Sequence, residues 1–178
     1  MSTPNKDIEK VEVRLKWDPS PPGAPAHDLD IIAATYPADE PYGGPAYLVH
    51  FDSRSPDGTI MLNRDSRTGQ GLGFDEVMTL ELNRLSAVYA RVVIGVVIQQ
   101  RNGRRTFEDI ANAGVQIREG YTNLAEDDFS AVGGATAATV AEFVRDGSGG
   151  WEFHETVRGF DGDPVSFAAA MGSRAPGA

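Results

Sequence analysis

Alternation of apolar and polar residues with a period of two is the feature of this sequence that most limits its fold. The segment Val11–Trp17 places an apolar residue at every second position between charged ones, as in a strand with one buried face. Similar short segments recur along the chain, separated by turns rich in glycine and proline. Such a chain predicts a mainly β fold: an antiparallel β-sandwich of two sheets with one or two short helices.

Turn signals such as Ser55–Gly58 and the Gly147–Gly150 hairpin give the expected strands their limits. The longest segment, Ala90–Gln100, is rich in β-branched residues and is expected at the centre of a sheet, closed by an Asn102–Gly103 turn. The expected strands are residues 11–17, 28–36, 47–51, 59–62, 77–82, 90–100, 114–119, 137–145 and 151–157.

Two segments are expected to be helical. Thr106–Ala113 has Thr106 in position to cap its N-terminus, with Glu108 and Asp109 in the first turn. Ser166–Met171 is expected to form a short terminal helix, and the tail beyond it, rich in alanine, proline and glycine, is expected to be frayed.

Composition narrows the class of protein. A length of 178 residues with 40% hydrophobic content fits one domain that can bury roughly 70% of its unfolded surface. No stretch approaches the ~20 apolar residues of a membrane span, so no direct membrane insertion is expected. The absence of cysteine excludes disulfides and thiol chemistry. With no secretory signal visible, this favours a cytoplasmic protein. A formal net charge of −10 argues against nucleic acid as a partner.

Two acidic clusters suggest a metal site. In a strand, residues i and i+2 point the same way, so Asp28 and Asp30 are expected to project together while Leu29 and Ile31 face the core. Paired carboxylates repel each other unless a cation lies between them. The alternative is a pair of solvated acids at the exposed start of a strand.

The second cluster is the glycine-rich segment Asp65–Glu76, which has acids at both ends and glycines at 69, 71 and 73. Glycine allows positive φ angles that turn backbone carbonyls inward. Carboxylate and carbonyl oxygens are the ligands that calcium prefers. The alternative is a solvated surface loop. An EF-hand is excluded, because Arg67 and Gly69 stand where side-chain ligands belong and Gln70 stands at the glycine position.

Catalytic motifs are not evident. Two acids could form a glycosidase pair, but these acids lie among glycines and polar residues rather than in an apolar pocket that would raise a pKa. His27, His50 and His154 lack metal or triad spacing, and the Gly69–Gly73 segment lacks the lysine of a phosphate-binding loop. We therefore expect no enzyme.

Taken in order, these segments resemble the TerD family of tellurium-resistance and general stress proteins. The resemblance runs from Val11 to about Val157. Its elements are Val13–Pro19, Asp28–Ala33, Tyr47–Asp52, Ser55–Gly58, the glycine-rich segment, Leu80–Leu85, Thr106–Phe107 with Asn112–Ala113, and Trp151–Phe153. It implies a TerD-like sandwich domain over residues 8–160, with a C-terminal extension over 161–178.

The resemblance also implies calcium sites, up to two, in the acidic loops. Three positions depart from the family pattern: Arg64 replaces a glycine, Ser66 an asparagine, and Phe74 the first aspartate of Asp-Asp-Glu. Because a phenyl ring offers no oxygen, one Ca²⁺ site is expected, with the second weakened by Phe74. A degenerate loop that holds no metal is the alternative. The candidate ligands are Asp28, Asp30, Asp65, Thr68, Gly69, Gly71, Gly73, Asp75 and Glu76. Asp75→Asn is expected to lower calcium affinity.

The implied function is a non-enzymatic, calcium-ordered binding module of the stress response, linked to resistance to tellurite or chemical stress. The implied partners are other TerD-type or membrane-associated stress proteins. Tellurite is not expected as a direct ligand, since the chain has no thiolate. Two alternatives remain open: a calcium-dependent module that binds carbohydrate or a membrane surface, and a calcium-silent protein-interaction domain.

Overall fold

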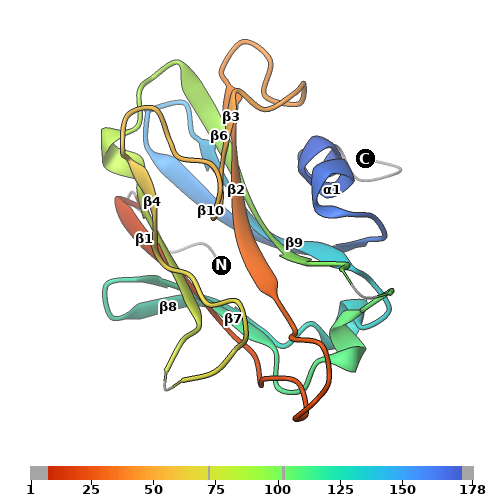
Figure 1. The fold of residues 1–178 in the computed structure, drawn as a ribbon. Coiled ribbons are helices and arrows are strands. Elements are labelled where there is room, and N and C mark those ends of the chain that lie inside the picture. Colours follow the sequence, from red (N-terminus) through yellow and green to blue (C-terminus); the bar gives the residue numbers. More distant parts are fainter. Residues whose placement is uncertain (1–7, 72, 102, 174–178) are drawn as a thin grey trace.

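A computed structural model describes residues 8–71, 73–101 and 103–173, and it confirms the predicted antiparallel β-sandwich (Figure 1). The first sheet contains, in spatial order, β4 (Ile60–Arg64), β5 (Glu76–Glu81), β1 (Lys10–Lys16), β7 (Gly114–Glu119) and β8 (Thr122–Asp127). The second contains β10 (Trp151–Phe160), β9 (Ala137–Arg145), β6 (Tyr89–Ile98), β2 (Leu29–Pro37) and β3 (Tyr47–Val49). As predicted, β6 is the central strand of its sheet.

The core lies between the two sheets. Apolar side chains from the inner face of each sheet interdigitate there, such as Val13 of β1 and Ile94 of β6, both fully buried. The first sheet keeps the expected alternation, with every second residue of β1 buried. In β2 eight of nine residues are buried, because its outer face is covered as well.

The cover on that outer face is α1 (Pro164–Ala170), close to the short helix expected near the C-terminus (Figure 1). Asp163 caps it by accepting a hydrogen bond from the Ser166 N–H. Phe167 packs against the outer face of the second sheet in a cluster that includes Tyr36. Gly95 of β6 makes this approach possible, because a Cβ there would lie 2.5 Å from the Phe167 ring. The tail at 174–178 and Asn102 of the expected turn lie outside the described residues.

The prediction of a helix over Thr106–Ala113 is wrong in its length and type. Only a single 3-10 turn, η2 (Phe107–Asp109), forms there. Its start at Thr106 was predicted correctly: the Thr106 N–H and hydroxyl both donate to the Asp109 carboxylate, at 2.9 and 3.0 Å. The turn cannot continue, since Asn112 takes a positive φ of 53° and Gly114 already begins β7. Two further 3-10 turns are η1 (Leu82–Arg84) and η3 (Ser130–Val132).

Strand β8 was not predicted. Its sequence, Thr-Asn-Leu-Ala-Glu-Asp, has no regular alternation, and none of its residues is fully buried. It lies at the edge of its sheet and pairs with β7 alone. The Gly147–Gly150 hairpin turn, in contrast, is confirmed by a hydrogen bond from the Asp146 N–H to the Gly150 carbonyl.

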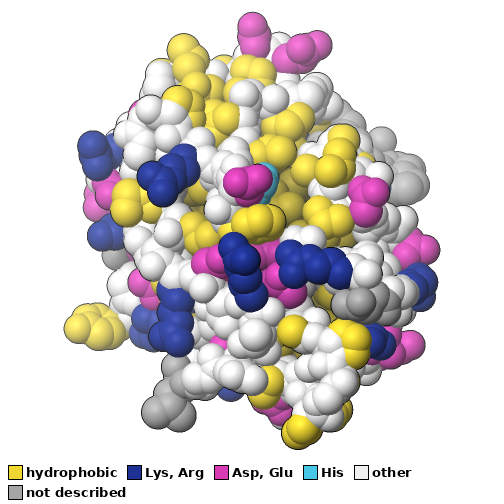
Figure 2. Space-filling view, viewed as in Figure 1, with side chains coloured by type: hydrophobic (Ala, Val, Ile, Leu, Met, Phe, Trp, Pro, Cys, Tyr) yellow, Lys and Arg dark blue, Asp and Glu magenta, His cyan; other side chains and the backbone are white. Residues whose placement is uncertain are grey.

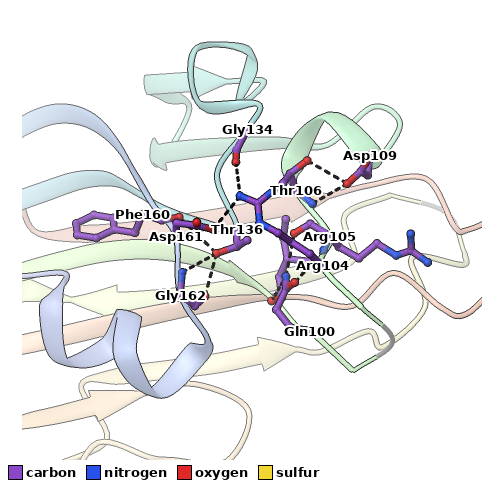
Figure 3. A network of polar contacts seen from close by, with 11 residues as sticks. Gln100, Arg104, Arg105, Thr106, Asp109, Gly134, Thr136, Phe160, Asp161 and Gly162 are labelled. Atoms are coloured by element: carbon purple, nitrogen blue, oxygen red, sulfur yellow. Dashed lines mark hydrogen bonds and ion pairs between the residues drawn. The ribbon is translucent and has the colours of Figure 1, made fainter.

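A polar network ties the loop after β6 to the C-terminal part of the chain (Figure 3). Arg104 donates to the Gly134 carbonyl at 3.0 Å and to Asp161 at 2.8 Å. The Thr136 hydroxyl is bonded to both the N–H and the carbonyl of Gly162, each at 2.9 Å. The end of β6, from which this loop leaves, pairs with the start of β2 through Ile98 and Leu29, where the acidic residues lie.

Candidate metal centre

Three buried carboxylates meet where β2 begins. Asp28 precedes β2, Asp30 is its second residue, and Glu76 is the first residue of β5 in the other sheet. One oxygen of each lies within 4.8 Å of the others. The exposed fractions of the three residues are 5%, 2% and 0%, so the alternative of solvated acids at an open strand end is wrong. The cluster spans the gap between the sheets.

Hydrogen bonds position these carboxylates but leave two oxygens without a partner. Glu76 Oε1 accepts the Ile31 N–H at 2.9 Å, and Asp30 Oδ2 accepts the Gln99 side-chain amide at 2.6 Å. Asp28 Oδ2 pairs with Arg101 Nη1 at 3.3 Å. Asp28 Oδ1 and Glu76 Oε2 are buried and accept no hydrogen bond. Unpartnered buried carboxylate oxygens are costly, and they are groups that a bound cation would satisfy.

Burial also perturbs the acidity of the cluster, so the expectation that these acids lie outside any environment that would raise a pKa is wrong. Desolvation, followed by the negative charge of Asp30, raises the pKa of Asp28 to about 7. The same two causes raise the pKa of Glu76 far above its ordinary value. The pKa of Asp30 is raised by desolvation in spite of its hydrogen bond from Gln99. A cation bound among the three would favour their charged forms.

The glycine-rich loop approaches the cluster through Asp65. This residue is exposed, and its charge contributes to the raised pKa of Asp28, Asp30 and Glu76. Gly69, Gly71 and Gly73 take φ angles of 75°, 113° and 80°, as their sequence predicts. Thr68 lies in the loop with its hydroxyl accepting the Gln70 N–H. Leu72, within the stretch proposed to supply carbonyl ligands, lies outside the described residues.

Asp75 and Phe74 point away from the three-carboxylate cluster. The Asp75 carboxylate accepts the Trp17 N–H at 2.9 Å, and its pKa is raised by desolvation. The Phe74 ring lies 5.3 Å from the guanidinium carbon of Arg14. The structure therefore separates Asp75 from its neighbour Glu76, and it gives Asp75 the local role of holding the end of β1.

Sequence reasoning missed Gln99 and Arg101, which complete the surroundings of the cluster. Both follow β6, whose last residue, Ile98, pairs with Leu29 of β2. That register places them beside Asp28 and Asp30. The signal available in the sequence was the end of the long β-branched segment, but its strand partner could not be read from the pattern.

The donor set fits a calcium ion. All the groups that converge are oxygens, two of them lack partners, and an adjacent loop brings a further carboxylate. Calcium binds six to eight such oxygens in flexible geometry. No nitrogen or sulfur ligand of the kind that zinc prefers is part of the cluster found among the described residues.

The TerD domain family model matches residues 1–170. The chain belongs to the TerD family. The resemblance drawn from its motifs is thereby confirmed.

Relatives of this TerD-family chain carry resistance and stress names. The tellurium resistance protein TerD of Alcaligenes sp. is 27% identical over 173 residues, covering 94% of this chain and 90% of the relative. General stress protein 16U of Bacillus subtilis (strain 168) is 27% identical over 179 residues, covering 94% and 90%. The crystal structure of a homologue of telluride resistance protein (TerD) from Streptomyces coelicolor A3(2) superimposes with a TM-score of 0.92 at 63% identity, covering 93% of this chain and 98% of that one.

No helix within the described part of this TerD-family chain is long and apolar enough to cross a membrane.

Proposed function

We propose that this TerD-family protein is a non-enzymatic calcium-binding module of the stress response, in which calcium orders the acidic loop for partner binding. The observation that carries the proposal is the pair of unpartnered, buried carboxylate oxygens on Asp28 and Glu76. The names of relatives, tellurium resistance and general stress proteins, support the link to stress.

One calcium site is proposed, held by Asp28, Asp30 and Glu76, with Asp65 and loop carbonyls as further oxygens. A bound calcium ion would supply the positive charge that three converging carboxylates lack. Residues of the chain would position the ligands: the Ile31 N–H holds Glu76 in place, and the Gln99 side-chain amide holds Asp30 in place. Asp65, which is exposed on the loop, would move toward the cluster when calcium binds. Ordering of the loop by its own carboxylate then creates a defined surface.

The proposed partners are other TerD-type or membrane-associated stress proteins in the cytoplasm. Such a partner would contact the loop and the exposed end of the sandwich near it. Loop order that depends on calcium would make this contact depend on calcium as well.

Calorimetric titration of chelator-stripped protein with calcium, in a millimolar magnesium background, tests the proposal. One saturable site is expected. Glu76→Gln keeps the shape of the side chain and its acceptor for Ile31, yet removes one charge, so it should abolish binding. Glu155→Gln, an exposed acid on β10, is the matched control and should bind as the parent protein does. Absence of heat from the parent protein would refute the calcium module.

The variant Asp75→Asn tests whether Asp75, like its neighbour Glu76, contributes to calcium binding. If Asp75 serves as a ligand, this variant should bind calcium at least several-fold more weakly. If its carboxylate serves only to accept the Trp17 N–H, the asparagine oxygen can accept the same hydrogen bond, and both calcium affinity and melting temperature should stay close to those of the parent protein.

A further inference from the structure

A second candidate site lies on the outer face of the second sheet. A groove of about 670 Å³ separates α1 from the residues around β3, a volume within the range of small-molecule sites. Its lining includes Ile32, Leu48 and Val97 from three neighbouring strands, and Ala168 and Ala169 from α1. Apolar side chains gather in the middle of this face in Figure 2, with acidic side chains and a histidine among them.

The charges that line the groove are all negative. Asp52, which follows β3, and Asp163, which caps α1, both line it, and Asp30 belongs to both the groove and the carboxylate cluster. Asp163 accepts the Ser166 N–H, which lowers its pKa and keeps it ionised. The lining residues, all within the described ranges, include no lysine or arginine. An anionic ligand would therefore be repelled.

The histidine of the groove does not offset this charge. His50 Nδ1 accepts the Asp52 N–H at 3.2 Å, which places any proton of the neutral ring on Nε2. Burial lowers the pKa of His50, so the ring stays neutral near pH 7. The neighbouring Phe51 ring lines the groove and is 44% exposed. Exposed aromatic faces attract organic cations.

We propose that this groove binds a small amphipathic organic cation, an amine that carries an apolar chain or ring. The apolar body would lie on Ile32, Leu48 and Val97, and the amine would lie between Asp52, Asp163 and the Phe51 ring. This site goes beyond calcium binding, since neither Asp52 nor Asp163 belongs to the carboxylate cluster.

Three eight-carbon probes that differ in charge test the proposal: octylammonium, octanoate and octanol. Binding to ¹⁵N-labelled protein is followed by NMR titration, with calcium and again with chelator. Octylammonium is expected to saturate one site and shift the amide signals of β3 and α1. Octanoate and octanol are expected to bind at least about five-fold more weakly, since two exposed charge pairs of ~0.5 kcal/mol each give that factor.

Variants then test separately whether the charge and the shape of the groove determine binding. Asp52→Asn with Asp163→Asn removes two charges, and asparagine preserves the cap of α1. This double variant should lose roughly five-fold in octylammonium affinity. Asp39→Asn with Glu155→Gln removes two exposed acids outside the groove and should change nothing. Ala169→Phe, on the exposed side of α1, should block the groove.

Equal binding of all three probes would overturn the proposal, because the groove would then be an apolar surface without selection for charge. Binding that is equal in the charge-removed and control variants would also overturn it. Each titration is run with and without calcium. The result for the groove can therefore be interpreted even if the protein binds no calcium.

Discussion

At the scale of single residues, the carboxylate cluster already carries a weak counter-ion of its own. Arg101 is 3.3 Å from Asp28, and Arg67 also lowers the pKa of that aspartate. Because the Arg101 side chain is 60% exposed, it can leave when a stronger cation arrives. The arginine would therefore compete with the proposed calcium ion.

Replacement of this arginine should strengthen calcium binding. Arg101→Gln is expected to raise calcium affinity by about two- to five-fold, the size of an exposed ion pair, and to lower the melting temperature of the metal-free protein slightly. Calorimetry and thermal melting measure the two effects. Arg104→Gln, in the same loop but bonded to Gly134 and Asp161, should leave calcium affinity unchanged. A fall in affinity for Arg101→Gln would mean that this side chain orders the site instead of competing for it.

The burial of Tyr36 leads to a separate prediction about the stability of the protein at alkaline pH. Its hydroxyl is buried without a hydrogen-bond partner, and burial raises its pKa from 10.0 to about 12. The unfolded chain therefore loses this proton first. Stability conferred by the neutral tyrosine is fully present below pH ~10 and falls by about 2–3 kcal/mol as the pH rises to ~12.

Tyr36→Phe should flatten this part of the profile, because phenylalanine keeps the ring contact with Arg91 but has no proton to lose. Urea unfolding at a series of alkaline pH values gives the comparison. Tyr121→Phe, at a tyrosine that is 99% exposed, should follow the parent protein. If the free energy of unfolding falls with pH equally in Tyr36→Phe and the parent protein, the Tyr36 hydroxyl is not buried in its neutral form.

The Asp28–Asp30 pair shows how far sequence reasoning reaches at this scale. Period-two geometry was enough to place both carboxylates together. Their burial could not be predicted, because the residues that cover them, Gln99 and Glu76, arrive through strand register and sheet packing. For the same reason, Asp75 and Glu76 could not be told apart in the sequence, although only Glu76 enters the cluster.

At the scale of elements, the glycine-rich loop depends on Trp17. A Cβ on Gly69 would lie 2.5 Å from the indole nitrogen of Trp17. That same nitrogen donates to the His27 carbonyl at 2.8 Å, beside Asp28. The indole thus joins the loop, the end of β1 and the start of β2.

Gly69→Ala should accordingly destabilise the protein strongly. Both the positive φ and the contact with Trp17 oppose a side chain, so a loss of about 2–4 kcal/mol is expected. Gly73→Ala meets open space at a similar φ and should lose only about 1 kcal/mol. Denaturant unfolding, followed by tryptophan fluorescence, measures both. Equal losses of stability in the two variants would show that the Trp17 indole moves to make room for the added methyl group.

Elements with a regular pattern were predicted well, and those shaped by their surroundings were not. The buried strand β6 follows from its run of β-branched residues, and the hairpin between β9 and β10 follows from its turn residues. Edge strand β8 has no buried face to impose alternation, so only its pairing with β7 reveals it. The turn at Phe107–Asp109 has the start signal of a helix, but β7 begins too soon for a helix to grow.

At the scale of the whole molecule, the cluster joins the two sheets. Asp28 and Asp30 belong with the second sheet and Glu76 with the first. A cation held by all three would act as a cross-link that exists only in the folded protein. Its binding energy therefore adds to the free energy of unfolding.

Calcium at about 100 times its Kd is expected to add ~2.7 kcal/mol and to raise the melting temperature by roughly 5–10 °C for a chain of this size. Differential scanning calorimetry with calcium and with chelator measures the difference. Glu76→Gln should show no dependence on calcium, and Glu155→Gln should show the full rise. An equal rise in Glu76→Gln would place the stabilising ion elsewhere.

The burial of β2 on both faces has a consequence for tolerance of substitution. Strand β1 alternates between buried and less buried positions, so a scan of all substitutions should find tolerant and intolerant positions in turn. Strand β2 has eight consecutive buried residues, with the sandwich core on one side and α1 or the carboxylate cluster on the other. Changes there should be rejected at every successive position, which places this strand, together with β6 and its own eight consecutive buried residues, among the slowest parts of the chain to diverge.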